Sequence, residues 1–324
     1  MNVAIMGEFP KTSLDLMKAE LGKYPELLHV EIAQTQEEAE KLTDAECIIL
    51  RILRLDHEAA LARYPKLKFI QKWGAGYDSI DMEEATKRGV LVSNTPGLNA
   101  FSVAEQTVML MLCVYRNLIN HYEFLKQGIW TKGRFMERTY SLKGKKVGLV
   151  GMGSIGKAVA KRVQSFETEV CYYDPFRLSE EKETELHVTY LPLEELLRTA
   201  DVVSLHLPLT PETANLINAE TLRLMKPTAI LINAARGGLV DEQALIGALE
   251  RGELLGAGLD CMAGEPVGKD DPILRAPNVT LTPHIGGVSM DLNGVMASAI
   301  IENVLRFART GKPDFVINKE LLKA

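Results

Sequence analysis

Short apolar runs and longer segments of helical periodicity alternate along the whole chain. The apolar runs are only a few residues long, which is typical of strands buried on both faces of a parallel sheet. In the first part of the chain we predict strands at Val3–Met6, Leu28–Ala33, Cys47–Leu50, Phe69–Gln71 and Val90–Val92. Between them we predict helices at Leu14–Gly22, Gln36–Leu42, His57–Ala62 and Met82–Arg88. This alternation indicates a parallel sheet flanked by helices.

A second series of the same kind begins after Lys145. Its predicted strands are Val147–Val150, Val170–Tyr173, Val202–Leu205, Ala229–Ile232, Gly256–Leu259 and Val279–Leu281. Its predicted helices are Lys157–Phe166, Leu193–Thr199, Ala219–Met225 and Glu242–Arg251. An amphipathic segment from about Asp291 to Arg309 closes the chain. Two such series predict an α/β protein with two doubly wound domains, each built on a parallel sheet.

A turn signal and a long apolar segment join the two series. The turn signal is NTPG, residues 94–97, which we interpret as a domain boundary or hinge. After it we predict one helix from about Asn99 to Lys126, with Ser102 and Glu105 forming a capping box at its start. The middle of this helix, TVMLMLCVY, is apolar on every face, so we expect it to be buried all round. Burial between domains or against another subunit fits this pattern, and burial inside one domain fits it nearly as well.

The strongest chemical signal lies at residues 145–174, KKVGLVGMGSIGKAVAKRVQSFETEVCYYD. Gly151, Gly153 and Gly156 follow a predicted strand and open a predicted helix. In a dinucleotide site, such glycines allow a tight turn, a close approach to pyrophosphate and close helix packing, while the helix N-terminus offers N–H groups to phosphate. Asp174 ends the next strand, 23 residues after Gly151, near the offset of about 20 residues for an acid that binds ribose hydroxyls. We therefore predict a nucleotide site.

The cofactor we predict is NAD, and two alternatives accompany this prediction. A glycine turn without any ligand also joins many strands to helices, but here the flanking strand, helix and terminal carboxylate favour the nucleotide. Asp174 would repel the 2′-phosphate of NADP and accept hydrogen bonds from free ribose hydroxyls. Arg177 lies close enough to contact a 2′-phosphate, yet the first residue after the strand is the acid.

Composition excludes several other classes of protein. The chain has 324 residues, 46% apolar and 25% charged, which is ordinary for a globular protein with two domains. Its net charge of −6 argues against a nucleic-acid or anionic-membrane partner. Cys47, Cys113, Cys171 and Cys261 lack the paired spacing of a metal site, and we expect no metal. The longest uncharged apolar run, Val108–Tyr115, is too short to span a bilayer, and the N-terminus reads as a strand rather than a signal peptide, so we expect a cytoplasmic protein.

Three residues with complementary chemistry follow strands of the second series. Ligands bind beyond the carboxyl ends of strands in a doubly wound sheet, and Arg236, Glu265 and His284 fall there. Arginine can bind a carboxylate in a two-point fork, histidine can exchange a proton near neutral pH, and a glutamate can orient that histidine. Each has a structural alternative as a surface cation, a loop acid or a strand-end cap, but their coincidence favours a site. His206 is a rival base, although its place two residues before Pro208 suits an adenosine contact better.

These segments resemble the D-2-hydroxyacid dehydrogenase family, which includes phosphoglycerate dehydrogenases and glyoxylate/hydroxypyruvate reductases. The resemblance covers essentially the whole chain and rests on NAARGG with Arg236, D-x-x-x-x-E-P with Glu265, and TPHIGG with His284. It implies an NAD-dependent oxidoreductase that interconverts a small D-2-hydroxy acid and its 2-oxo acid by hydride transfer. Arg236 would bind the substrate carboxylate and carbonyl, and His284, supported by Glu265, would exchange the proton.

The resemblance also implies further contacts and an architecture. Substrate would contact Gly74, Ala75 and Gly76 of WGAGYDSID, and Arg51 near the substrate mouth. Besides Gly151, Gly153, Gly156 and His206, which were named above from their own positions, the cofactor would contact Ser154, Ile155, Asp174, Leu207, Pro208, Ala234, Ala235, Asp260, His284 and Gly286. We expect a flavodoxin-like substrate domain at 1–97 plus 291–324 and a Rossmann NAD-binding domain at 98–290. The domains would close over the substrate, and the long helix would build a homodimer.

The substrate and one rival function stay open. The GYD and NTPG segments look more like glyoxylate reductases, whereas NAFSVAEQ looks more like phosphoglycerate dehydrogenases. The family's formate dehydrogenases carry glutamine where Glu265 stands, so formate oxidation is not expected. The family also includes NAD(H)-sensing corepressors with little or no turnover, which can retain the same three residues; the acidic, compact chain favours the enzyme. A catalytically silent dinucleotide-binding protein is the third alternative.

Overall fold

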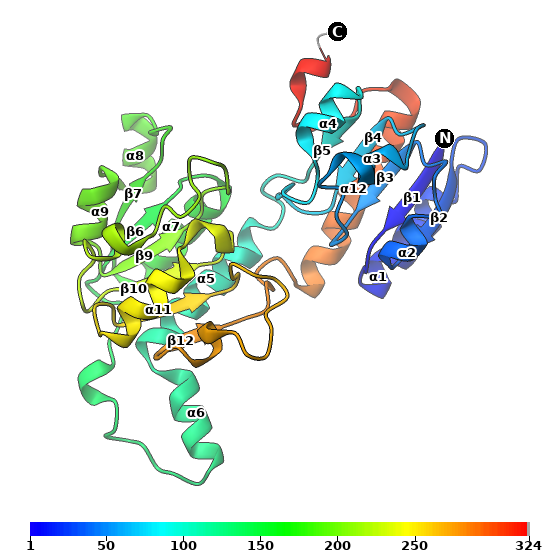
Figure 1. Ribbon diagram of the computed structural model, residues 1–324. Coiled ribbons are helices and arrows are strands. Elements are labelled where there is room, and N and C mark those ends of the chain that lie inside the picture. The colour runs from blue at the N-terminus through cyan, green and yellow to red at the C-terminus, as the bar shows by residue number, and fades with distance from the viewer. Residues whose placement is uncertain (323–324) are drawn as a thin grey trace. The chain divides into compact units, whose positions relative to one another are not determined.

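The computed structural model describes residues 1–322 and contains two α/β units (Figure 1). One unit consists of Met1–Asn99 together with the described residues from Val288 onward, and the other is Ala100–Gly287. The chain therefore leaves the first unit after Asn99 and re-enters it at Val288. The boundaries expected from the sequence, 97/98 and 290/291, fall close to these crossings, and the final two residues of the expected substrate domain, 323 and 324, lie outside the described residues.

The first unit is built on a five-stranded parallel sheet with the order β2-β1-β3-β4-β5. Its strands are β1 Asn2–Met6, β2 His29–Ala33, β3 Cys47–Leu50, β4 Phe69–Lys72 and β5 Leu91–Ser93. Its helices are α1 Lys11–Leu21, α2 Gln36–Ala39, α3 Glu58–Ala62, α4 Met82–Lys87 and α12 Met290–Thr310, with a final short turn at Lys319–Leu322. This strand order is the flavodoxin-like one, so the predicted fold of this unit is confirmed.

Successive residues of β1 supply two different hydrophobic layers, one on each face of the first sheet. Val3 and Ile5 belong to a cluster with α1 and α12, in which Ile300 is fully buried. Ala4 and Met6 belong to a second cluster, which includes residues of α3 and α4. The alternation follows from the period of two in a strand. The last long helix of the chain thus completes a core that the first residues begin.

The second unit is built on a seven-stranded parallel sheet with the order β12-β11-β10-β9-β6-β7-β8. Its strands are β6 Lys146–Val150, β7 Glu169–Tyr173, β8 Thr189–Tyr190, β9 Val202–Leu205, β10 Ile230–Asn233, β11 Gly256–Leu259 and β12 Val279–Leu281. Its helices are α5 Ala100–Tyr115, α6 Leu118–Lys126, α7 Ser154–Val163, α8 Glu180–Leu186, α9 Leu193–Thr199, α10 Ala219–Leu222 and α11 Glu242–Glu250. Counted from β6, the order contains the Rossmann arrangement 3-2-1-4-5-6, with one more strand beyond it. The predicted Rossmann fold is therefore confirmed.

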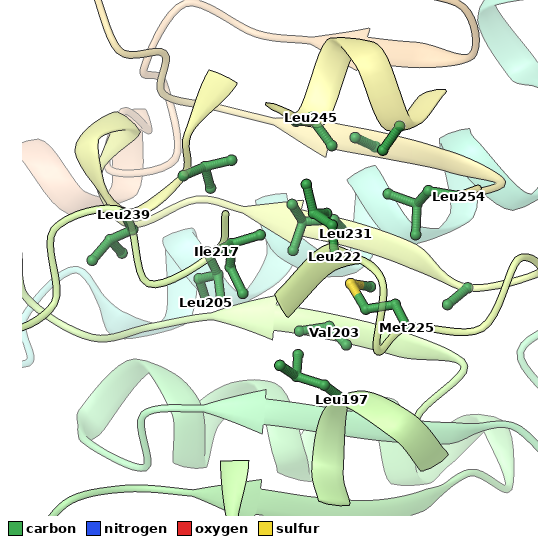
Figure 2. Close-up of a cluster of buried hydrophobic side chains, with 14 of the residues drawn as sticks. Leu197, Val203, Leu205, Ile217, Leu222, Met225, Leu231, Leu239, Leu245 and Leu254 are labelled. Carbon is green, nitrogen blue, oxygen red and sulfur yellow. The ribbon is translucent and has the colours of Figure 1, made fainter. Parts of the chain in front are cut away.

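Leucine and valine side chains from strands and helices fill the core of this sheet (Figure 2). Val203 and Leu205 of β9 pack with Leu231 of β10, and Leu197 of α9 and Leu245 of α11 complete the layer. All five are fully buried. The strands that this core covers are parallel, so their carboxyl ends lie at one edge of the sheet.

The predicted single helix from Asn99 to Lys126 is wrong, because the chain forms two helices there. Asn117 interrupts them with a left-handed backbone, φ 49° and ψ 37°. Asparagine tolerates this conformation better than most residues. The Asn117 side chain also stabilises the break between the two helices, because its Nδ2 donates to the Arg138 carbonyl at 2.9 Å and to Thr139 Oγ1 at 3.3 Å.

The predicted capping box is also wrong, and within this single chain the helix is not buried on every face. Ser102 lies inside α5, and its Oγ donates to the Gly286 carbonyl instead of a backbone amide of its own helix. Glu105 pairs with Arg162 at 3.0 Å. α5 packs against α7, β10 and β11 of its own unit, and Met109 stays 42% exposed in this chain. None of the helices among residues 1–322 combines the length and apolar character needed to cross a bilayer.

Candidate active site

The glycine-rich turn joins β6 to α7 near the middle of the second sheet. Gly151 has φ +108°, and its N–H donates to the Tyr173 carbonyl at 2.8 Å. A Cβ on Gly151 would lie 2.7 Å from the carbonyl carbon of His206, so only glycine fits. A Cβ on Gly156 would lie 2.2 Å from the Gly151 oxygen, which shows how tightly α7 packs on the turn.

The N-terminus of α7 is open. The helix begins at Ser154 with Gly153 as its N-cap residue, and no side chain caps it. Apart from Gly153 and its two chain neighbours, residues 1–322 place no heavy atom within 4 Å of the position that a Cβ on Gly153 would take. The first N–H groups of α7, such as those of Ser154 and Ile155, thus have no side-chain cap at the positive end of the helix dipole. This geometry fits the diphosphate of a dinucleotide.

Asp174 follows β7 and is tied to the glycine turn. Its Oδ2 accepts a hydrogen bond from the Met152 amide at 2.7 Å, and its Oδ1 accepts one from the Phe176 amide at 2.8 Å. The carboxylate therefore stands beside the turn, where an acid that binds ribose hydroxyls is expected. A carboxylate oxygen has more than one lone pair, so both oxygens can still accept from a ligand.

Arg177, the cation that could have favoured NADP, is engaged elsewhere. Its Nε and Nη2 donate to the two carboxylate oxygens of Glu183 at 2.8 and 2.9 Å. The Tyr172 hydroxyl donates to the same carboxylate at 2.7 Å. Hydrogen bonds from Arg177 and Tyr172 lower the pKa of Glu183 to about 2, so the acid stays charged and holds the guanidinium.

His206 follows β9 and has the environment of a neutral histidine. Its Nε2 lies 3.0 Å from Ser204 Oγ, while its buried Nδ1 has no hydrogen-bond partner among residues 1–322. Burial lowers the pKa of His206 to about 4. A histidine that is neutral at pH 7 is a poor proton donor, which weighs against His206 as the base. Next to it the Leu207 side chain is buried and Pro208 is exposed.

Arg236 is placed by a turn that Asn233 organises at the end of β10. Asn233 Nδ2 donates to the Arg236 carbonyl at 2.8 Å, and its Oδ1 accepts from the Ala235 amide at 3.1 Å. Such a side-chain turn is typical of asparagine, so Asn233 at the end of a strand is a sequence signal for this turn. A Cβ on Gly237 would lie 1.8 Å from the Met262 carbonyl oxygen, so this turn packs directly on the loop that carries Glu265.

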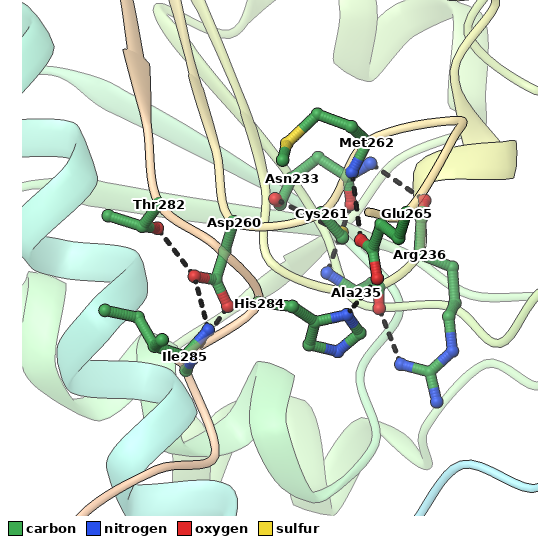
Figure 3. A network of polar contacts seen from close by, with 11 residues as sticks. Asn233, Ala235, Arg236, Asp260, Cys261, Met262, Glu265, Thr282, His284 and Ile285 are labelled. Atoms are coloured by element: carbon green, nitrogen blue, oxygen red, sulfur yellow. Dashed lines mark hydrogen bonds and ion pairs between the residues drawn. The ribbon is translucent and has the colours of Figure 1, made fainter. Parts of the chain in front are cut away.

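His284 and Glu265 are hydrogen-bonded to each other beside that turn (Figure 3). Nδ1 of His284 lies 2.8 Å from Oε2 of Glu265, and the two side chains are 45% and 36% exposed. Partial burial of Glu265 opposes ionisation, but the hydrogen bond and charge of His284, the Met262 amide and Arg236 outweigh it, so the pKa of Glu265 lies below its usual value. Nε2 of His284 makes no hydrogen bond within the described chain. A ring anchored at one nitrogen and open at the other suits a general acid or base.

Asp260 organises the loop around His284. Its carboxylate is 1% exposed and accepts hydrogen bonds from Thr282 Oγ1 at 2.6 Å and from the amides of Ile285 and Gly286 at 3.0 and 2.7 Å (Figure 3). Its backbone carbonyl accepts from the His284 amide at 2.7 Å. Asp260 and Gly286 were both predicted as cofactor contacts, and the structure gives them these partners within the loop.

Three residues around this loop were not predicted as site residues, namely Thr282, Gln106 and Ser102. Gln106 Nε2 donates to Thr282 Oγ1 at 2.8 Å, and Ser102 contacts Gly286 as described above. The signal for Ser102 and Gln106 was present, since two polar residues four positions apart share one face of a helix that is otherwise strongly apolar.

The substrate candidates of the first unit lie at the carboxyl ends of β3 and β4. Arg51 Nη1 donates to the Glu8 carbonyl, and burial lowers the pKa of Arg51. Gly74 uses its N–H on Thr95 Oγ1 at 3.0 Å, and the Ala75 carbonyl accepts from Asn94 Nδ2 at 2.6 Å. The N–H groups of Ala75 and Gly76 donate no hydrogen bond within residues 1–322. These two amides are therefore free to bind an oxygen of a ligand.

Comparison with known proteins gives one consistent result. The family model described as "D-isomer specific 2-hydroxyacid dehydrogenase, NAD binding domain" matches residues 108–286. A glyoxylate reductase from Korarchaeum cryptofilum is 42% identical over 261 residues, which cover 80% of this chain and 78% of that protein. The crystal structure of a glyoxylate reductase from Paecilomyes thermophila has a TM-score of 0.88 at 26% identity and covers 99% of both chains. An NADPH-dependent glyoxylate/hydroxypyruvate reductase from Sinorhizobium meliloti, solved with NADP and malonate, has a TM-score of 0.82 at 28% identity, over 98% of this chain and 96% of that one.

Proposed function

Because the chain belongs to the D-isomer specific 2-hydroxyacid dehydrogenase family, we propose that it reduces a small 2-oxo acid to the D-2-hydroxy acid with Arg236, Glu265 and His284. The chain is an oxidoreductase with an NAD-binding domain, and the substrate and residue roles are our proposal. The observation that carries it is the 2.8 Å contact between His284 Nδ1 and Glu265, which leaves Nε2 open beside Arg236's turn. Glyoxylate and hydroxypyruvate are the first substrates to test, because the relatives named above act on them.

The proposed reaction divides the work among the three side chains. NAD(H), when bound, supplies or accepts the hydride at the substrate carbon. During reduction, Nε2 of His284 donates a proton to the carbonyl oxygen, which becomes the hydroxyl; during oxidation it takes that proton back. The Glu265 carboxylate fixes the ring and carries the charge opposite to that of the protonated ring. Arg236 binds the substrate carboxylate and carbonyl through its planar fork.

Several features of the second unit support NAD as the preferred cofactor. The open N-terminus of α7 fits the diphosphate, and Asp174 stands where a 2′-phosphate would meet negative charge. Arg177 is held by Glu183 instead of being directed at such a phosphate. The buried Nδ1 of His206 is a further polar atom that a bound nucleotide could satisfy. In the first unit, Arg51 and the amides of Ala75 and Gly76 are the proposed substrate contacts.

The proposal is tested by NADH oxidation at neutral pH with glyoxylate, hydroxypyruvate, 3-phosphohydroxypyruvate, pyruvate and a branched 2-oxo acid, each repeated with NADPH. On the best substrate, His284→Ala should lower kcat by roughly 10²–10⁴-fold, because the proton donor is lost. NADH affinity, measured by fluorescence, should stay close to that of the wild type.

His57→Ala is the matched control, because His57 is an exposed histidine of the first unit with no part in this site. It should leave kcat unchanged. Turnover by His284→Ala within twofold of the wild type would refute the role of His284. No turnover on any 2-oxo acid, with NADH still bound, would favour the NAD(H)-sensing alternative.

We also propose that the protein is a homodimer formed through the surface around α6. No residue of α6 is buried, and Trp130 and Met136 beyond it are 79% and 74% exposed. An open groove of about 1120 Å³ runs between α5 and this segment, with Val108, Met109 and Leu112 among its lining residues. An exposed apolar surface of this kind is typical of a protein interface, and a second copy of the chain is the occupant we propose.

A further inference from the structure

Helix α5 carries two polar side chains to the loop that bears His284. Ser102 Oγ donates to the Gly286 carbonyl at 2.7 Å, and Gln106 Nε2 donates to Thr282 Oγ1 at 2.8 Å. The two residues are four positions apart, so both project from one face of the helix. The helix is thus hydrogen-bonded to both ends of the loop, at residue 282 and at residue 286.

The hydrogen bonds continue from Gln106 to Asp260 through the Thr282 hydroxyl, and Gln106 Nε2 also donates directly to Asp260 Oδ1 at the longer distance of 3.4 Å. Thr282 Oγ1 accepts from Gln106 and donates to Asp260 Oδ1 at 2.6 Å. A hydroxyl has only one proton to donate. Because Thr282 Oγ1 accepts from the Gln106 amide, its own proton is available for the Asp260 carboxylate. Asp260 is a buried carboxylate, so each of its donors is needed to offset the cost of burying the charge.

The backbone of His284 needs this support. Its φ is +53°, a left-handed conformation that residues other than glycine seldom adopt and that persists only where the surroundings hold it. Its N–H donates to the Asp260 carbonyl, and the next two amides donate to the Asp260 carboxylate. A Cβ on Gly286 would lie 2.9 Å from Asp260 Oδ2, so the loop has little room to shift there.

We propose that Gln106 is a positioning residue for the reaction: acting through Thr282 and Asp260, it holds the His284 backbone so that Nδ1 stays on Glu265 and Nε2 points to the substrate. This proposal rests on the role given to His284 above. Loss of the Gln106 amide or of the Thr282 hydroxyl frees one end of the loop and misaligns the ring. A misplacement of about 1 Å can cost roughly 10²-fold in rate.

The test uses three variants of the full chain with the best 2-oxo acid. Gln106→Leu keeps the bulk of the side chain and removes the donor, and Thr282→Val keeps the shape and removes the hydroxyl. Each should lower kcat about tenfold or more, with the NADH dissociation constant within about twofold of wild type. Thr282→Ser, which keeps the hydroxyl, should restore most of kcat. The loss should fall on kcat rather than on KM, because the proton transfer and not the binding is impaired.

A glutamine outside the loop provides the matched control. Gln164 Nε2 donates to the Leu186 carbonyl at 2.8 Å at the end of α7, away from the His284 loop. Gln164→Leu also removes a side-chain amide donor, with its hydrogen bonds to the Leu186 and His187 carbonyls, and should lower thermal stability without changing kcat. If Thr282→Val fails to fold, Gln106→Leu alone still decides the question, because Gln106 is only half-buried.

The outcomes separate this inference from the proposed function. Wild-type kcat in Gln106→Leu and Thr282→Val, with His284→Ala inactive in the same assay, would overturn the positioning role alone. Equal losses in Thr282→Ser and Thr282→Val would also overturn it, because the hydroxyl would then not matter. An active His284→Ala would overturn the proposed function and this inference with it.

Discussion

Two histidines of the second unit follow strands of the same sheet, yet their surroundings give them different chemistry. His206 is enclosed, with one ring nitrogen on a serine hydroxyl and the other without a partner in the described chain. His284 is nearly half exposed and paired with a carboxylate. The sequence allowed both as the base, and the environment of each side chain favours His284.

The enclosed histidine should make folding stability depend on pH. The folded-state pKa of His206, about 4, lies below the value of about 6.5 in an unfolded chain, so its contribution is full above pH 6.5 and is lost as pH falls toward 4. Lowering the pH from 7 to 5 should reduce the free energy of unfolding by roughly 2 kcal/mol through this group. Urea unfolding of wild type and His206→Asn at both pH values checks this. An identical pH dependence in the two proteins would show that His206 does not carry it.

The residues of the site were predictable only where topology alone places them. Arg236, Glu265 and His284 follow β10, β11 and β12, and the carboxyl ends of parallel strands meet at one edge. Gln106 was not predictable in this way, because its partner Thr282 is 176 positions away in the chain. Their contact depends on how α5 packs on the sheet, which no local pattern specifies.

At the scale of elements, segments with buried apolar residues could be predicted from the sequence, and a helix without them could not. The strands Cys47–Leu50, Val202–Leu205, Gly256–Leu259 and Val279–Leu281 have the predicted bounds, because each is a short, largely apolar run that a polar residue follows. Helix α8, EEKETEL, was missed because none of its residues is buried and it therefore has no apolar stripe. It begins instead at a Ser179 side-chain cap and is held by the Arg177–Glu183 ion pair.

The break between α5 and α6 should depend on the conformation of one residue. Asn117→Gly keeps the left-handed backbone and loses only the side-chain hydrogen bonds, so we expect a loss of about 1 kcal/mol in unfolding free energy. Asn117→Val adds the left-handed strain of a β-branched residue, about 1–2 kcal/mol more. Chemical denaturation of both variants checks the order. A valine variant as stable as the glycine variant would mean that the backbone at Asn117 is not strained.

At the scale of the whole molecule, the apolar surface around α6 should set the oligomeric state. Leu118→Glu with Met136→Glu places two charges on this surface, because both side chains are exposed in the single chain, and should convert a dimer to a monomer. Sedimentation equilibrium measures the mass directly. Met290→Glu, which changes an equally exposed methionine at the start of α12, is the control and should leave the mass unchanged. A wild-type protein of monomer mass would contradict the proposed homodimer.

The first unit is assembled from the two ends of the chain, and this matters during synthesis on the ribosome. α12 supplies Leu292, Met296 and Ile300 to the cluster that contains Val3 and Ile5. Between the first segment of that unit and this helix, the ribosome must make all of Ala100–Gly287, which takes roughly 10–40 s at 5–20 residues per second. During that interval the nascent N-terminal segment has no helix to cover one apolar face of its sheet, while the continuous second unit can already fold. The unit that emerges first is therefore the last to be completed.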